Sequence, residues 1–214
     1  MSAYAGVVLD MDSTLSSMEG IDWLARRRAP AVARKIEALT ARAMDGELAL
    51  DDIYGERLAL IRPSELEIDE LALRYESTLA PGAPDAVARM RAEGVQLVIV
   101  SGGILQAILP AARALGFADA DVHAVRVEFD ARGEYAGFDS ASPLVTQHGK
   151  MTVVRALSLP RPLLAVGDGS TDAALLPIVD AFAAFTGFVR REPVVAVADS
   201  ELRSFHDLLE LVLA

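Results

Sequence analysis

Cysteine is absent from this chain of 214 residues, and histidine occurs only three times. Without cysteine there is no disulfide, no thiolate zinc site and no cysteine nucleophile. This absence does not indicate whether the protein works in an oxidising or a reducing compartment. Positive charge is also in deficit, because 20 basic residues face 31 acidic ones and the net charge is −11. We therefore expect no surface for nucleic acid or anionic lipid, whereas an enzyme that needs a cation fits this composition.

Long hydrophobic runs are missing as well. No apolar stretch approaches the ~20 residues that cross a bilayer, and the N-terminus MSAYAGVVLD lacks the basic start of a secretory leader. We therefore expect a cytoplasmic protein without a membrane partner. The hydrophobic residues, which make up 52% of the chain, are spread over short bursts such as VQLVIV and PLLAV. These bursts have the length of β-strands.

The hydrophobic bursts alternate with helical patterns, which is typical of a parallel sheet that is buried on both faces. We predict strands near residues 6–10, 95–100, 163–167, 181–185 and 194–198. We predict helices near residues 83–93, 103–115, 149–158, 170–178 and 201–213. This order predicts an α/β fold with a doubly wound, mainly parallel sheet, whose ligand site lies at the carboxyl ends of the strands.

Two segments interrupt this alternation. Residues 16–80 carry helical periods and no convincing strand, so we predict a small helical domain inserted after the first strand. Residues 121–139 alternate between apolar and polar positions on both sides of Ala131-Arg132-Gly133, which predicts a β-hairpin. The α/β core would then comprise residues 1–15 and 81–214.

Two aspartates follow the first predicted strand in the stretch VLDMDSTL. Asp10 and Asp12 are two positions apart, so both side chains can lean toward the same point, where like charges need a cation or a shared proton between them. Mg²⁺ is often held by carboxylates together with phosphate oxygens, so the pair suits a magnesium and phosphate site. Taken alone, the pair is equally compatible with a turn and a capping aspartate.

A second predicted strand ends in LLAVGDGSTD, where two glycines flank Asp168 and Asp172 follows four residues later. The glycines let the backbone approach a ligand, and the spacing places the second carboxylate one turn along a helix. The same residues would also fit a tight loop followed by a helix that has a carboxylate in its first turn. On its own, this stretch therefore does not distinguish a ligand site from an ordinary turn.

A third predicted strand ends in VIVSGG, with the hydroxyl of Ser101 and the free amides of Gly102 and Gly103 at an expected helix N-terminus. Such an arrangement binds anions, although a serine N-cap with a glycine turn fits equally well. Lys150, after QHG, could add a fixed positive charge, or it could be an ordinary solvated lysine. Because all these residues meet at one edge of the predicted sheet, we favour a single site for metal and phosphate.

Taken in order, DMDSTL, VSGG, Lys150 and GDGSTD resemble the four motifs of the haloacid dehalogenase (HAD) superfamily, and the resemblance covers nearly the whole chain. Within it, the chain most resembles the phosphoserine phosphatase family, because EGIDWLA, RAMDG, ERLALIRPS and GEYAGFD also match outside the shared core. The resemblance implies a Rossmann-like core with residues 16–80 as its cap. It also implies a Mg²⁺-dependent phosphatase that releases L-serine and phosphate from O-phosphoserine in the last step of serine biosynthesis.

The resemblance assigns roles to the motif residues. Asp10 would attack phosphorus and become an aspartyl phosphate, and Asp12 would protonate the departing serine oxygen and later take a proton from water. Mg²⁺ would be held by Asp10, the backbone carbonyl of Asp12 and Asp168, with Asp172 in support directly or through water. The residues that would bind phosphoryl oxygens are Ser101, Gly102, Gly103, Lys150 and Thr171.

Four residues of the helical segment would recognise the substrate, again by resemblance. Glu19 would bind the ammonium group and Arg57 the carboxylate, although an exposed carboxylate and a surface salt bridge are the ordinary interpretations of such residues. Met44 and Gly46 would pack around the serine moiety, although a methionine at helical spacing is usually a core residue. Asp45 adds a charge beside Met44, and we expect it to face outward.

Two other functions stay open at this point. A related HAD phosphatase or phosphotransferase could act on another small phosphomonoester, and the Glu19 and Arg57 pair argues against it because the pair demands a zwitterion. A non-catalytic phosphate-binding module needs no acid and base carboxylate, so the presence of both Asp10 and Asp12 argues against that function. A homodimer is compatible with the sequence.

Overall fold

The computed structural model describes residues 2–214. Within them, one sheet has the strand order β3-β2-β1-β6-β7-β8, and all its neighbouring strands are parallel. These strands are β1 (Gly6–Leu9), β2 (Gln96–Ile104), β3 (Val122–Val125), β6 (Leu163–Gly167), β7 (Ala181–Phe185) and β8 (Ser200–Leu202). The predicted doubly wound α/β fold is confirmed.

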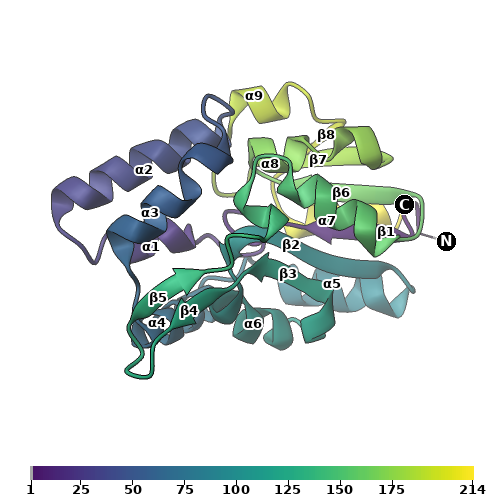
Figure 1. Cartoon of the computed structure of the whole chain (residues 1–214). Coiled ribbons are helices and arrows are strands. Elements are labelled where there is room, and N and C mark those ends of the chain that lie inside the picture. The colour runs from purple at the N-terminus through teal and green to yellow at the C-terminus, as the bar shows by residue number, and fades with distance from the viewer. Residues whose placement is uncertain (1) are drawn as a thin grey trace.

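Helices surround this sheet (Figure 1). The α-helices are α1 (Gly20–Ala25), α2 (Pro30–Met44), α3 (Tyr54–Ile61), α4 (Glu65–Ser77), α5 (Ala83–Ala92), α6 (Leu105–Ala114), α7 (Gly149–Leu157), α8 (Ser170–Ala173), α9 (Glu192–Val195) and α10 (Phe205–Val212). Short 3-10 helices lie at Leu50–Asp52, Asp119–Asp121, Pro143–Val145 and Leu176–Ile178. Among the described residues, none of these helices has both the length and the apolarity that crossing a membrane requires.

The hydrophobic core lies against the central strands. β1 and β6 are buried along their whole length, because helices cover both faces of a parallel sheet. In Figure 1, α7 and α8 lie in front of the sheet, and α10 packs against α5. The apolar bursts at β1 and β6 are therefore central strands, as their composition predicts.

The segment between β1 and α5 folds into helices α1 to α4. In Figure 1, α2 and α3 lie to one side of the sheet, whereas α4 lies near α6 and packs against it. The start of α4 is a capping box, in which the Ser64 hydroxyl accepts from the Glu67 amide and the Glu67 carboxylate accepts from the Ser64 amide. The helical content expected of residues 16–80 is thus observed, and the division into cap and core stays a prediction.

The predicted hairpin near residues 121–139 is shorter than expected. Its antiparallel strands are β4 (Val127–Phe129) and β5 (Tyr135–Phe138), with the register shifted between Glu128 and Phe129. The preceding segment, Val122–Val125, instead forms β3 and pairs with β2 at the edge of the main sheet. Both pieces have the same alternating period, so the pattern predicts one strand although the pieces belong to different sheets.

The predicted strand at residues 194–198 is wrong. Glu192–Val195 forms helix α9, and the strand that pairs with β7 is β8, a few residues later. Pro193 lies in the first turn of α9, where its missing N–H leaves no helical hydrogen bond unmade. The valines of VVAVA favour a strand by propensity, but the helix start and the burial of Val194 outweigh that preference.

Candidate active site

The carboxyl ends of three neighbouring strands form the floor of one cavity. Asp10 follows β1, Ser101 lies near the end of β2, and Asp168 follows β6. Because β1 lies between β2 and β6 and the three strands are parallel, these ends lie side by side where the strand order reverses. The cavity is also lined by Asp12, Glu19, Ile21, Thr40, Met44, Leu50, Arg57, Gly102, Gly103, Leu144, Thr146, Lys150 and Thr171.

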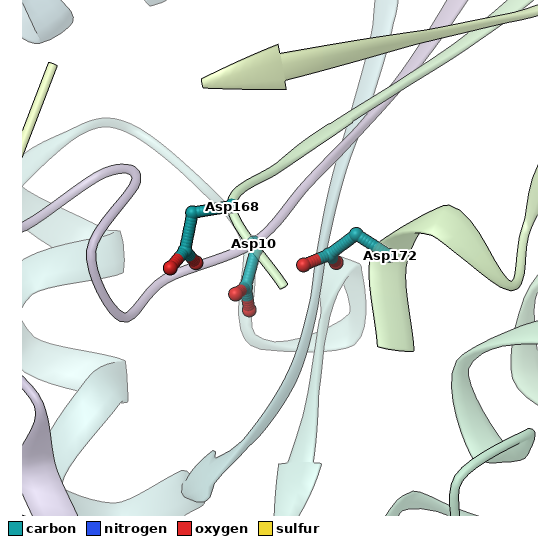
Figure 2. Close-up of side chains that lie close together, drawn as sticks. All are labelled: Asp10, Asp168 and Asp172. Atoms are coloured by element: carbon teal, nitrogen blue, oxygen red, sulfur yellow. The ribbon is translucent and has the colours of Figure 1, made fainter. Parts of the chain in front are cut away.

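Three carboxylates gather at this point. Figure 2 shows Asp10, Asp168 and Asp172, each of which offers an oxygen atom within 4.8 Å of the others. All three residues are buried, and Asp10 Oδ1 accepts no hydrogen bond of good geometry from the described residues. Three buried carboxylates with oxygen atoms at this spacing fit a hard divalent cation such as Mg²⁺.

Lys150 links two of these carboxylates. Its Nζ atom lies 2.8 Å from Asp10 Oδ1 and 2.6 Å from Asp172 Oδ1, and the side chain is only 5% exposed. Burial alone would lower the pKa of Lys150, but the two carboxylates outweigh it and hold that pKa above its ordinary value. Lys150 is therefore a fixed positive charge at the first residues of α7, as the sequence suggested.

Asp172 is held in place by its neighbours on both sides. Its Oδ2 atom accepts a hydrogen bond from the Gly169 amide at 3.1 Å, while Lys150 binds the other oxygen. Burial raises the pKa of Asp172 to about 7, even with Lys150 beside it. A Cβ atom on Gly167 would lie 2.1 Å from Asp172 Cγ, so only glycine fits at that position. This crowding explains the first glycine of the GDG stretch.

A second cation, Arg191, reaches the cluster from the start of α9. Its Nε atom lies 3.1 Å from Asp168 Oδ2, its Nη1 atom 3.2 Å from Asp45 Oδ1, and its Nη2 atom 3.9 Å from Glu19 Oε1. The guanidinium thus joins a core carboxylate to two carboxylates of the helical segment. We expected Asp45 to face outward; its side chain is partly exposed, but it contacts Arg191 at the edge of the cluster.

The two carboxylate oxygens of Asp12 have different surroundings. Its Oδ1 atom accepts hydrogen bonds from Tyr75 Oη at 2.5 Å and from the Gly20 amide at 3.1 Å. Its Oδ2 atom is the nearest neighbour that a Cβ atom on Gly103 would meet, at 2.9 Å. Burial, followed by the charge of Asp10, raises the pKa of Asp12 to about 7. A carboxyl group of this kind can hold a proton near neutral pH.

The SGG stretch lies in strand β2 and not at a helix start, which corrects our expectation. β2 runs to Ile104 and α6 begins at Leu105. The Gly103 amide donates to Ser101 Oγ at 3.0 Å, so it is not a free donor, while the Gly102 carbonyl accepts from Tyr54 Oη at 2.9 Å. The irregular register between Val100 and Ile104 re-aims this part of the strand toward the cavity.

Arg57 is buried inside the cavity wall and is no surface residue. It is 3% exposed, and its Nη1 atom donates to Thr40 Oγ1 at 2.9 Å. Thr40 in turn donates to Asp22 Oδ1 at 2.6 Å, which orients the guanidinium. Arg57 Nε has no hydrogen-bond partner among the described residues, and burial lowers the pKa of Arg57. A buried donor without a partner indicates a place for an anionic ligand.

Glu19 lines the same cavity and is not an exposed helix residue. Its Oε1 atom accepts a hydrogen bond from Ser13 Oγ at 2.7 Å. Burial, followed by the charge of Asp12, raises the pKa of Glu19 to about 8. A raised pKa of this origin means that a ligand cation would be favoured beside this carboxylate.

The other predicted residues differ in their positions. Met44 and the buried Thr171 line the cavity. Gly46 does not line it, and lies with a φ of +82° in the turn after α2, a conformation that favours glycine. The last turn of α2, just before Gly46, is held to the core, because Ser170 Oγ donates to the Ala43 carbonyl at 2.7 Å.

Sequence reasoning missed three contributors to the site, namely Tyr75, Arg191 and Thr40. Tyr75 occupies a buried position of α4 in an ordinary helical pattern, and Thr40 does the same in α2. Arg191 stands in the polar stretch before α9, which has no motif. Local patterns report only which face of a helix is apolar, so contacts across the fold carried no signal in the sequence.

Comparison with known proteins agrees with this geometry. The haloacid dehalogenase-like hydrolase family matches residues 7–177. Phosphoserine phosphatases of Mus musculus and Homo sapiens are 36% and 35% identical to the chain over 206 residues, which are 95% of this chain and 91% of each relative. The crystal structure of a phosphoserine phosphohydrolase-like protein from Francisella tularensis superposes with a TM-score of 0.89 at 25% identity, over 96% of this chain and 98% of that one. The chain therefore belongs to the haloacid dehalogenase-like hydrolase family, among the relatives of phosphoserine phosphatase.

Proposed function

We propose that this phosphatase hydrolyses O-phosphoserine to L-serine and phosphate through an aspartyl phosphate, the last step of serine biosynthesis. One observation carries the proposal. The cavity that contains the carboxylate cluster also contains a buried arginine with an unused donor, Arg57, and a half-buried acid, Glu19. One end of the cavity thus suits a phosphoryl group and a metal, and the other suits the carboxylate and ammonium groups of an amino acid.

The residues at the phosphoryl end fit a double displacement. Asp10 forms a bond to phosphorus while the bond from phosphorus to the serine oxygen breaks, and Asp12 gives its proton to that oxygen. Water then attacks phosphorus, Asp12 takes the water proton, and the bond between Asp10 and phosphorus breaks. Lys150, Ser101 and the Gly102 amide would hold the phosphoryl oxygens and stabilise the charge that develops on them.

A magnesium ion fits the carboxylate cluster by its donor set. The carboxylates of Asp10 and Asp168 and the backbone carbonyl of Asp12 would hold it, and Asp172 would support it through Lys150 and the Gly169 amide. When bound, the ion would neutralise negative charge on the phosphoryl group and on Asp10. Arg191, which contacts Asp168, would have to share that carboxylate with the ion.

Residues 16–80 would act as a cap over this cavity. They supply Glu19, Met44 and Arg57 to its wall, and Asp45 and Ala43 contact the core. Closure of such a segment excludes bulk water from the reacting groups, and its opening can limit turnover. A cytoplasmic location and a homodimer stay predictions, and light scattering on the purified protein measures the second.

The experiment compares phosphate release from O-phospho-L-serine and from phosphoethanolamine, which lacks the carboxylate. We expect Mg²⁺-dependent release from phosphoserine that EDTA abolishes. Arg57→Ala should lower kcat/KM for phosphoserine by about 10- to 100-fold, which corresponds to the roughly 1.5–3 kcal/mol of a charged hydrogen bond. The same substitution should change kcat/KM for phosphoethanolamine little, because no carboxylate is present to lose its partner.

Arg26→Ala is the matched control, since Arg26 is an exposed residue of the same helical segment and pairs with Glu37. It should leave both substrates unaffected. Equal losses on both substrates for Arg57→Ala would contradict the assignment of Arg57, and preferred release from another phosphomonoester would indicate a related phosphatase. Binding of phosphate without turnover of any phosphomonoester would leave only a phosphate-binding module.

A further inference from the structure

The hydroxyl of Tyr75 contacts the carboxyl group of Asp12. Tyr75 comes from α4, its side chain is fully buried, and its Oη atom donates to Asp12 Oδ1 at 2.5 Å. The same oxygen also accepts a hydrogen bond at 3.1 Å from the backbone amide of Gly20, which is the first residue of α1. Two helices that follow β1 in the chain therefore hold one oxygen of a carboxyl group that lies directly after that strand.

Position 20 is shaped to receive this hydroxyl. A Cβ atom on Gly20 would lie 2.1 Å from Tyr75 Oη, so no larger residue fits there unless the tyrosine moves. Gly20 thus provides both the space for the hydroxyl and a second donor to Asp12 Oδ1. The close approach of tyrosine, glycine and aspartate needs three separate segments of the chain, which is more than a tyrosine filling the core requires.

The contact also determines which oxygen of Asp12 can carry a proton. A carboxylic acid group accepts hydrogen bonds at its carbonyl oxygen and donates from the other oxygen. With Oδ1 occupied by two donors, the proton belongs on Oδ2, which lies beside Gly103, a residue that also lines the cavity. An acid that must protonate a leaving oxygen has to present its proton from that side.

We propose that Tyr75 is a positioning residue, which orients the carboxyl group of Asp12 so that Oδ2 delivers its proton to the departing oxygen of an alkyl phosphate. The inference rests on the proposed function, in which Asp12 is the acid. Tyr75 itself touches neither phosphorus nor the leaving group. Its contribution should therefore scale with how much the leaving group needs a proton.

The test compares Tyr75→Phe with the unchanged protein on two leaving groups. Serine alkoxide is a poor leaving group that needs protonation, whereas p-nitrophenolate leaves without it. We expect kcat for O-phosphoserine to fall about 10-fold, a part of the roughly 10²- to 10⁴-fold that a general acid contributes. The rate of the first p-nitrophenolate burst from p-nitrophenyl phosphate, which reports only attack by Asp10, should change less than about twofold.

Tyr54→Phe is the matched control. Tyr54 is equally buried, and its hydroxyl donates to the Gly102 carbonyl at 2.9 Å and not to Asp12. Loss of this hydroxyl should change both substrates by the same factor. Equal effects of Tyr75→Phe on both leaving groups, or no effect on phosphoserine, would overturn the inference. Absence of phosphoserine turnover in the unchanged protein would instead overturn the proposed function.

Gly20→Ala tests the same contact from the other side and does not depend on the fate of the Tyr75→Phe variant. The added methyl group should displace the Tyr75 hydroxyl and reproduce the loss on phosphoserine with little change in the p-nitrophenolate burst. In the Tyr75→Phe background, Gly20→Ala should add much less than it does alone, because residues that act on one contact are not additive. Full additivity of the two substitutions would contradict a shared role in orienting Asp12.

Discussion

Removing the buried charge of Lys150 should destabilise the protein strongly, and the loss should depend on metal and on pH. Lys150→Met keeps most of the side-chain volume and deletes the ammonium group that lies 2.8 Å from Asp10 and 2.6 Å from Asp172. At an effective dielectric constant of about 20, each contact is worth roughly 6 kcal/mol of attraction. Desolvation offsets much of this, and breaking a buried pair typically costs about 3–5 kcal/mol.

Urea denaturation followed by circular dichroism measures this loss. In EDTA at pH 8, we expect the free energy of unfolding of Lys150→Met to be lower by about 3 kcal/mol or more. Saturating Mg²⁺ should reduce the difference, because a bound cation compensates the same carboxylates. Lys35→Met is the matched control, since Lys35 pairs with Glu56 at 2.6 Å on the surface with its side chain 53% exposed. Such a pair contributes about 0–1 kcal/mol.

The pH dependence follows from the direction of the Asp172 shift. Its pKa in the folded protein is raised from 3.8 to about 7, so the folded state binds more protons than the unfolded state between these values. The stability that this group contributes is therefore present at low pH and lost as the pH rises through about 7. Without Lys150 the pKa rises further, so the loss caused by Lys150→Met should be smaller at pH 5 than at pH 8. A loss equal at both pH values, or no larger than that of Lys35→Met, would refute this reasoning.

Three further predictions concern other contacts of the site. Arg191→Gln should lower the melting temperature in EDTA because the guanidinium compensates the charge of Asp168, and Mg²⁺ should restore most of the lost melting temperature. Differential scanning fluorimetry measures both values. A decrease that Mg²⁺ leaves unchanged would argue against this role of Arg191. Thr40→Val should raise KM for O-phosphoserine about 10-fold in steady-state assays with little change in kcat, since the Thr40 hydroxyl orients Arg57. Glu19→Gln should raise KM for O-phosphoserine but not for phosphoglycolate, which has no ammonium group, and a parallel rise for both would remove Glu19 from substrate recognition.

The arrangement of the sheet could be predicted from the sequence because its signals are local. Short apolar bursts alternate with helical periods, and such a pattern has few solutions other than a parallel sheet covered on both faces. The aspartates after β1 and β6 and the hydroxyl of β2 could be brought together by the rule that ligands bind at the carboxyl ends of such strands. The structure places Asp10, Ser101 and Asp168 around one cavity, as that rule requires.

The local predictions failed where two signals competed. The valines of residues 194–198 have strand propensity, yet Val194 and Val195 lie in helix α9, whose first turn contains Pro193. The glycines after Ser101 suggested a helix start, yet the strand continues to Ile104 with an irregular register. In both cases, pairing and packing partners from distant segments decided the outcome.

By itself, the sequence determined the parallel α/β architecture, the acidic residues that follow β1 and β6, the lysine that opens α7, and the family to which the chain belongs. Only the tertiary structure decided what surrounds them. Tyr75 reaches Asp12 across 63 positions of the chain, and Arg191 reaches Asp45 across 146. Such contacts leave no local periodicity, because hydrogen bonds and ion pairs depend on distances in space that follow from the packing of whole helices.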